Sequence, residues 1–229
     1  QSPPLMLMYG GRTRGGALKD DVWQLVAQQT DAGETYTWTQ LTSFQGDPPP
    51  GFRARHTAIA RVTATDKSMI VFGGKSDLTP AEDRVHRLTK NALGQWTWQL
   101  LSPFGTAPKR SGHTTIYDAD NDRMLVFGGR DENNALASTT VHALSLGAFP
   151  TWSTPTVTGS APAARDGHTM VVDPNTYKRS EIDWKRILLF GGHNGSVRKN
   201  DVWNLWIRVG SGELEWQAAN VLSCPSVCA

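Results

Sequence analysis

The chain has 229 residues, of which 38% are hydrophobic, 22 are glycine and 13 are proline. So many turn-forming residues, with no sustained helical periodicity, indicate an all-β fold of short strands and exclude a helical or membrane-spanning chain. A net charge of +2 lacks the basic excess of proteins that bind nucleic acid through its phosphates, so we expect no nucleic-acid partner.

Four segments share one pattern, an apolar strand that ends in two glycines. They recur roughly 60 residues apart, which is the sign of a repeat architecture. Glycine permits the positive φ and the close backbone approach that are needed where a chain leaves a crowded strand. The pairs are Gly10 and Gly11, Gly73 and Gly74, Gly128 and Gly129, and Gly191 and Gly192.

Other signals accompany each glycine pair in a constant order. A Val-x-x-Leu strand follows the pair, and a tryptophan comes next, at Trp38, Trp98, Trp152 and Trp216. An Arg-x-x-His segment precedes the last three glycine-bearing strands. Its members are Arg53 and His56, Arg110 and His113, and Arg165 and His168. Because these residues recur at equivalent positions, we expect them to be structural and to form hydrogen bonds within or between repeats.

This order of motifs resembles the kelch-repeat β-propeller family, whose repeats are similar to those of the galactose oxidase central domain. The resemblance implies four-stranded antiparallel blades packed around a channel. It places the Arg-x-x-His segment at strand one, the glycine-bearing segment at strand two and the Val-x-x-Leu segment at strand three. The tryptophan segment is then strand four, the outermost. Continuous apolar runs suit strands packed on both faces, and tryptophans fill the wedge between blades.

The repeats divide the chain into a propeller at 1–223 and a cysteine-containing tail at 224–229. We expect a partial blade 1 at 1–45, blade 2 at 46–104, blade 3 at 105–158 and blade 4 at 159–220. Blade 1 lacks an Arg-x-x-His strand, so the chain is either part of a larger propeller or an unusual four-bladed ring. Since an open stack exposes apolar faces, which is costly, we favour the first reading.

The residue after each glycine pair is basic or a histidine. In the kelch fold these residues open loops that lie together near the channel mouth. Converging cations there would suit a carboxylate, an acidic glycan or an acidic peptide, although acids in the same loops could instead pair with them locally. The candidate ligand-binding residues are Arg12, Lys75, Arg130 and His193, with Arg14 and Arg198 from the same loops.

No catalytic constellation emerges, and we expect no metal and no cofactor. The copper ligands of galactose oxidases do not carry over, because the tyrosines are scattered and the cysteines lie in the tail. We therefore predict a non-catalytic binding or scaffold module that recognises a protein, peptide or glycan through its loops. The alternatives are an extracellular carbohydrate-active protein, similar to kelch-like sialic-acid mutarotases, and a structural subunit whose open blade edge another chain completes.

The two cysteines, Cys224 and Cys228, stand close together at the end of the chain. A disulfide between them would indicate an extracellular or secreted protein. Two free thiols, and a cytoplasmic setting, are the alternative.

Overall fold

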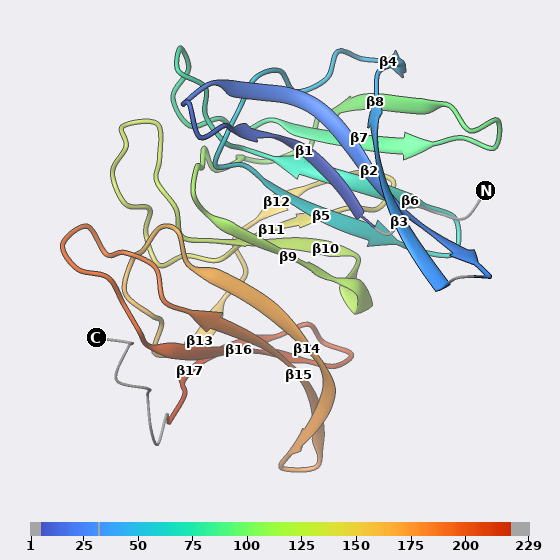
Figure 1. The fold of residues 1–229 in the computed structure, drawn as a ribbon. Coiled ribbons are helices and arrows are strands. Elements are labelled where there is room, and N and C mark those ends of the chain that lie inside the picture. The colour runs from blue at the N-terminus through green and yellow to red at the C-terminus, as the bar shows by residue number, and fades with distance from the viewer. Residues whose placement is uncertain (1–5, 32, 221–229) are drawn as a thin grey trace.

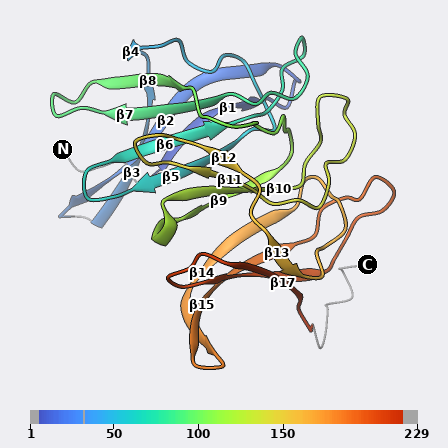
Figure 2. The same cartoon turned by 180° about the vertical axis from the view of Figure 1, so that it is seen from behind.

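The chain folds into four β-sheets in the computed structural model, which describes residues 6–31 and 33–220. The sheets follow one another in chain order, and we number them blade 1 to blade 4 (Figure 1). Figure 2 shows the same succession from behind, with blade 1 and blade 4 at opposite ends of the series. The predicted all-β, kelch-type propeller architecture is confirmed. In the described part, no helix is long and apolar enough to cross a membrane.

Each blade is built from strands that neighbour one another in sequence. Blade 1 contains β1 (Met6–Arg12), β2 (Leu18–Thr30) and β3 (Gly33–Leu41). Blade 2 contains β4 (Phe44–Gly46), β5 (Thr57–Val62), β6 (Lys67–Phe72), β7 (Val85–Lys90) and β8 (Trp96–Leu101). Blade 3 contains β9 (Thr114–Asp118), β10 (Arg123–Phe127), β11 (His142–Ser145) and β12 (Trp152–Ser153), with a 3-10 turn η1 (Ala119–Asn121) between the first two. Blade 4 contains β13 (Val157–Gly159), β14 (Thr169–Arg179), β15 (Ile182–Phe190), β16 (Val202–Arg208) and β17 (Leu214–Ala218).

The outer edges of blades 2 and 4 differ from the prediction, because the tryptophan strand is not outermost there. The strand β4 pairs in parallel with β8, and β13 pairs in parallel with β17. Both short strands belong to the segment that connects one blade to the next. That segment crosses the outer edge and satisfies the backbone groups that the edge strand would otherwise leave unpaired.

The hydrophobic core lies between neighbouring blades. At the first interface, Tyr9 and Val22 of blade 1 pack with Val71 and Trp98 of blade 2. The two following interfaces repeat the arrangement, and each buries the tryptophan of its later blade. A tryptophan therefore fills each of these wedges, as the resemblance implied. Trp38 of blade 1 is the exception, with 45% of its surface exposed.

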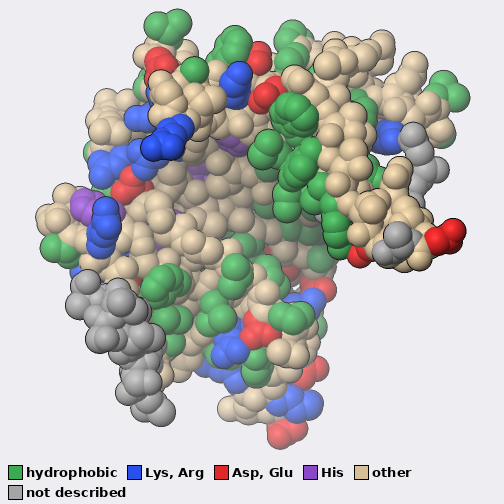
Figure 3. Space-filling view, in the orientation of Figure 1, with side chains coloured by type: hydrophobic (Ala, Val, Ile, Leu, Met, Phe, Trp, Pro, Cys, Tyr) green, Lys and Arg blue, Asp and Glu red, His purple; other side chains and the backbone are tan. Residues whose placement is uncertain are grey.

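The outward faces of blades 1 and 4 are apolar and uncovered in this structure. Met6, Met8 and Tyr36 are exposed on blade 1, where hydrophobic side chains gather on the face seen in Figure 3. Val171 and Phe190 are exposed on blade 4. Such faces are consistent with a fragment of a larger propeller.

The terminal cysteines, Cys224 and Cys228, lie outside the described residues. The predicted disulfide, and the secreted location inferred from it, stay predictions.

Candidate functional site

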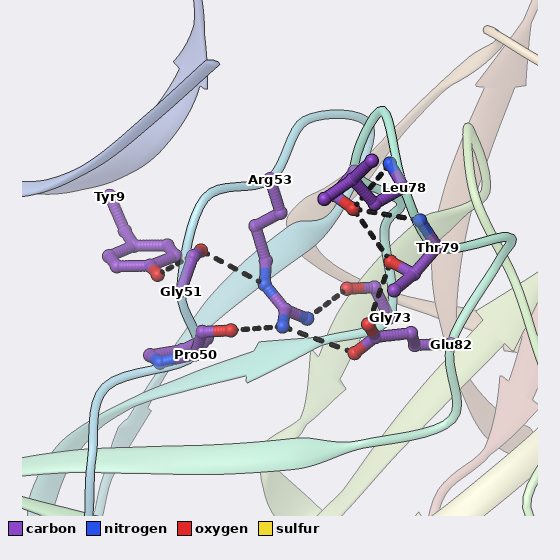
Figure 4. A network of polar contacts seen from close by, with 9 residues as sticks. Tyr9, Pro50, Gly51, Arg53, Gly73, Leu78, Thr79 and Glu82 are labelled. Carbon is purple, nitrogen blue, oxygen red and sulfur yellow. Dashed lines mark hydrogen bonds and ion pairs between the residues drawn. The ribbon is translucent and has the colours of Figure 1, made fainter.

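Arg53 is a buried arginine that ties the start of blade 2 to the loop after its glycine pair (Figure 4). Its guanidinium donates hydrogen bonds to the carbonyl oxygen of Gly73 at 2.8 Å and to the carbonyl oxygen of Pro50. It also donates to Glu82 Oε2 at 3.1 Å. The charge is thereby neutralised and the carbonyls are satisfied, as a buried guanidinium requires.

Arg165 occupies the equivalent position in blade 4, and its side chain is fully buried. It donates to the carbonyl oxygen of Gly191 at 2.9 Å and, with two nitrogens, to the Asp201 carboxylate at 2.6 and 2.8 Å. These hydrogen bonds, with a smaller one from the Trp203 indole, lower the pKa of Asp201 to about 2. The pair therefore stays ionised at neutral pH.

The three repeated histidines lie edge-on to the aromatic residue that ends strand two of the preceding blade. His56, for example, lies 5.4 Å from Tyr9 between ring centroids. Burial, with a contribution from the neighbouring arginine, lowers the pKa of His56 and His168 to about 4 and that of His113 to about 3. Neutral imidazoles held in the core fit packing between blades rather than acid–base chemistry.

The loop face of the molecule, where strands two and three are connected, carries an ion-pair cluster that spans three blades. Asp166 of blade 4 is buried and accepts a hydrogen bond from Arg130 Nε of blade 3 at 3.0 Å. It also pairs with the guanidinium of Arg55, which reaches across from blade 2. Burial alone would raise the pKa of Asp166, but the hydrogen bonds from the two arginines outweigh it and lower the pKa. One carboxylate thus forms ion pairs with two guanidinium groups.

Arg55 adopts a backbone conformation that arginine rarely takes, with φ of 61°. The equivalent residues in blades 3 and 4 are Gly112 and Gly167, with φ of 64° and 65°. The three are linked by backbone hydrogen bonds, from Gly112 N to the Arg55 carbonyl at 2.8 Å and from Gly167 N to the Gly112 carbonyl at 2.9 Å. The Arg55 guanidinium lies over Gly112, where an added Cβ would come within 2.6 Å of it. Strain of this kind clusters at functional sites.

Neither Arg55 nor Asp166 was among the residues that the sequence pattern pointed to. The signal that could have found Arg55 is an arginine standing where the next two repeats have glycine. Asp166 carries no such signal, because its role depends on arginines from two other blades.

The predicted candidate residues do not all meet in one group on the loop face, although Arg130, His193 and Arg198 lie around Asp166. Arg12 pairs with Asp77 of the neighbouring loop, and Arg130 pairs with Asp166. Lys75 is held through its backbone, which exchanges two hydrogen bonds with Ala54 at 3.0 Å. Figure 3 shows blue and red side chains mixed at the left of the molecule, where these loops lie in Figure 1.

His193 and Arg198 meet at a cavity of about 410 Å³ on the outward side of blade 4. His193 Nδ1 accepts a hydrogen bond from the backbone N–H of Gly195 at 3.0 Å, and Arg198 is exposed. Lys199 and Asp166 also line the cavity. Arg14 is exposed in the first loop and contributes to neither cluster.

A family model described as the KLHDC2/KLHL20/DRC7 Kelch-repeats domain matches residues 59–225. The chain belongs to this kelch-repeat family. Membership accounts for the recurring glycine pairs and the blade order, and it supports a non-catalytic protein-interaction module.

Curated relatives are similar over most of this chain but are much longer. The chain is 29% identical to Acyl-CoA-binding domain-containing protein 4 of Arabidopsis thaliana over 158 residues, which are 69% of this chain and 22% of that protein. It is 22% identical to Host cell factor 1 of Homo sapiens over 235 residues, covering 96% of this chain and 10% of that protein. The segment that this chain matches is thus a small part of each relative.

A solved structure shows the same fold at low sequence identity. A chain in the cryo-EM structure of RAG in complex with one melted and one unmelted RSS matches with a TM-score of 0.66 and 16% identity. The match covers 96% of this chain and 63% of that chain. At this identity the likeness speaks for the fold alone.

Proposed function

We propose that this kelch domain binds a protein partner through its loop face, at the cluster formed by Arg55, Arg130 and Asp166. The observation that carries the proposal is the conformation of Arg55. An exposed arginine is held at positive φ, where glycine suffices in the neighbouring repeats, and the backbone strain is retained although the fold does not require it. The cluster carries two cations and one carboxylate, so a complementary partner surface is acidic.

Arg55→Gly tests this proposal, because glycine is the residue that blades 3 and 4 carry at the same position. We expect the variant to fold normally and to lose partner proteins that the wild-type domain retains in quantitative affinity purification from cells. Arg208→Gln is the matched control, since Arg208 is a half-buried arginine at the last position of β16 and pairs with Glu213, outside the cluster. Identical partner sets for all three proteins would contradict the proposal.

An acidic glycan is the second candidate ligand, and the cavity on blade 4 favours it. Three cationic or protonatable side chains, His193, Arg198 and Lys199, line this cavity beside the exposed aromatic ring of Phe190. Cations beside an aromatic ring suit a sialylated or sulfated sugar. Binding on a glycan array that Arg198→Gln abolishes, with Arg55→Gly unaffected, would assign this ligand instead of a protein.

We also propose that blade 1 is completed by a strand from another chain or from another part of a longer chain. Asp201 of blade 4 accepts both the Trp203 indole N–H and the Arg165 guanidinium. Asp21 of blade 1 accepts the equivalent Trp23 indole N–H at 3.0 Å, but no arginine of the described residues pairs with it. A strand bearing an Arg-x-x-His segment beside β1 would supply that arginine.

The native mass of the purified chain tests this assembly. We expect a mass above that of a 25.1 kDa monomer, or, for a longer parent protein, a stable monomer once the missing blades are included. Asp21→Asn removes the expected arginine partner and should weaken the association. A stable, non-aggregating 25.1 kDa monomer that does not respond to Asp21→Asn contradicts the proposal.

A further inference from the structure

Three arginines begin blades 2, 3 and 4 at equivalent positions, but one of them has no carboxylate partner. Arg53 pairs with Glu82 and Arg165 pairs with Asp201. Arg110 forms an ion pair with none of the described residues. Its guanidinium donates to the carbonyl oxygen of its own neighbour, Lys109, at 2.8 Å and lies 3.3 Å from His142 Nε2.

The sequence explains why the carboxylate is missing in blade 3. In blade 4 the acid is Asp201, directly before Val202, and the residue directly before Val141 in blade 3 is Thr140. A threonine hydroxyl cannot replace a carboxylate as the counter-ion of a guanidinium. Here it accepts a hydrogen bond from the Ser138 hydroxyl at 3.1 Å.

Two acids lie in the nearby loop, but both have other partners. Asp131 Oδ1 accepts the backbone N–H groups of Asn133 and Ala135, each at 2.9 Å, and so shapes its own turn. Glu132 lies 3.9 Å from the ammonium group of Lys109. They act on Arg110 from a distance, and they reduce the effect of burial on its pKa.

Arg110 is distinguished from the other unpaired arginines by its burial. Among the described residues, the others without an ion pair are exposed: Arg14, Arg84 and Arg198. Arg110 is half-buried, and burial lowers the pKa of its guanidinium. A desolvated cation that lacks a counter-ion is costly, so a fold keeps one where an anion can reach it.

We propose that Arg110 is an open carboxylate-binding site, in which a bound carboxylate takes the place that Asp201 holds in blade 4. A planar guanidinium binds a carboxylate with two parallel hydrogen bonds, as Arg165 does. A monoanion fits better than a phosphate dianion, since Asp131 and Glu132 are close enough to repel the second charge. The carboxylate comes either from an acidic side chain of a bound protein or from a small free acid.

Thr140→Asp is the variant that tests this site, because it restores within blade 3 the acid that blade 4 has. Thr140→Asn is its matched control, because asparagine has the shape of aspartate but carries no charge. Thermal unfolding of the full chain is measured in sodium acetate and in sodium chloride at equal ionic strength. We expect acetate to raise the melting temperature of the wild type and of Thr140→Asn by about 2 °C and to leave that of Thr140→Asp unchanged. We expect Thr140→Asp itself to melt about 2–4 °C above Thr140→Asn.

The source of the carboxylate is read from a second probe. A short glutamate peptide with blocked ends that acts at lower concentration than acetate, and loses its effect when glutamate is replaced by glutamine, indicates a protein ligand. Acetate acting as well as the peptide indicates a small acid. The proposal is overturned if acetate shifts Thr140→Asp as much as the wild type, or if Thr140→Asp is no more stable than Thr140→Asn.

The proposal for Arg110 and the function proposed above have one feature in common, which is that a protein is a ligand in both. The experiment uses acetate and a defined peptide, and it leaves Arg55 in place. Failure at Arg110 therefore does not count against the loop-face cluster, and failure of Arg55→Gly does not count against Arg110.

Discussion

Blades 3 and 4 present the same face to their following neighbour, yet one face is buried and the other is not. Ile116 and Phe127 of blade 3 lie against blade 4 and are 5% and 1% exposed. Their equivalents in blade 4, Val171 and Phe190, are 51% and 50% exposed. Apolar residues at equivalent positions of the two blades therefore differ in exposure because of what lies beside them. An apolar strand pattern in a repeat protein specifies a face that can be buried. Whether this face is buried depends on whether a following repeat packs against it.

The largest effect should come from removing the aromatic side chain that ends strand two. Phe127→Ala should cost about 3–5 kcal/mol of unfolding free energy, because it leaves a cavity between His168 and Trp216. Phe190→Ala should cost less than about 1 kcal/mol in the isolated chain, since half of this ring is already in water. Denaturant titration of both variants makes the comparison. Equal costs would mean that the face of blade 4 is covered in solution.

The next largest loss of unfolding free energy should come from replacing a buried arginine of an Arg-x-x-His segment. Arg165→Gln should cost about 3 kcal/mol, because the Asp201 carboxylate and the Gly191 carbonyl lose their partner. Arg110→Gln should cost about 1 kcal/mol or less, because no carboxylate is left behind. The measurement is again denaturant unfolding, at neutral pH. A loss at Arg110 as large as at Arg165 would reveal a counter-ion in solution.

Acid should weaken the covered interfaces through their histidines. Because burial lowers the pKa values of His56, His113 and His168 to about 3–4, the unfolded chain binds protons first as pH falls below about 6.5. The histidines therefore cost no unfolding free energy above that pH. As the pH falls towards 4, the free energy of unfolding declines by at most about 1.4 kcal/mol per pH unit for each histidine. His113→Gln should reduce the slope of unfolding free energy against pH by one histidine's share. An unchanged slope would show that His113 is accessible to protons in the folded protein.

The smallest effect on stability should come from Arg55→Gly. Glycine relieves the positive φ of this residue, by about 1 kcal/mol, while the lost ion pair with Asp166 costs a similar amount. The melting temperature should therefore stay within about 4 °C of the wild type. Arg130→Gln serves as the control, because it removes the other cation on Asp166 without changing a strained residue.

The sequence alone was enough for the architecture. Glycine pairs after apolar strands, the Val-x-x-Leu segments and the tryptophans specify four repeats, because each is the local requirement of a strand packed between two blades. The same regularity identifies Arg53 and Arg165 as repeated residues, and the structure places them in buried sockets. The outer strands β4 and β13 were missed, since three residues in a connecting segment carry no periodicity.

Only the tertiary structure shows which charged residues pair with one another on the loop face. Arg55, Arg130 and Asp166 come from three blades, and the loops decide which cation reaches which carboxylate. Likewise, the isolation of Arg110 depends on where Asp131 and Glu132 direct their side chains. Local sequence specifies how each strand folds, because backbone conformation and burial repeat with the pattern. Charge pairing across blades depends on distances between residues that are remote in sequence, and no local pattern encodes them.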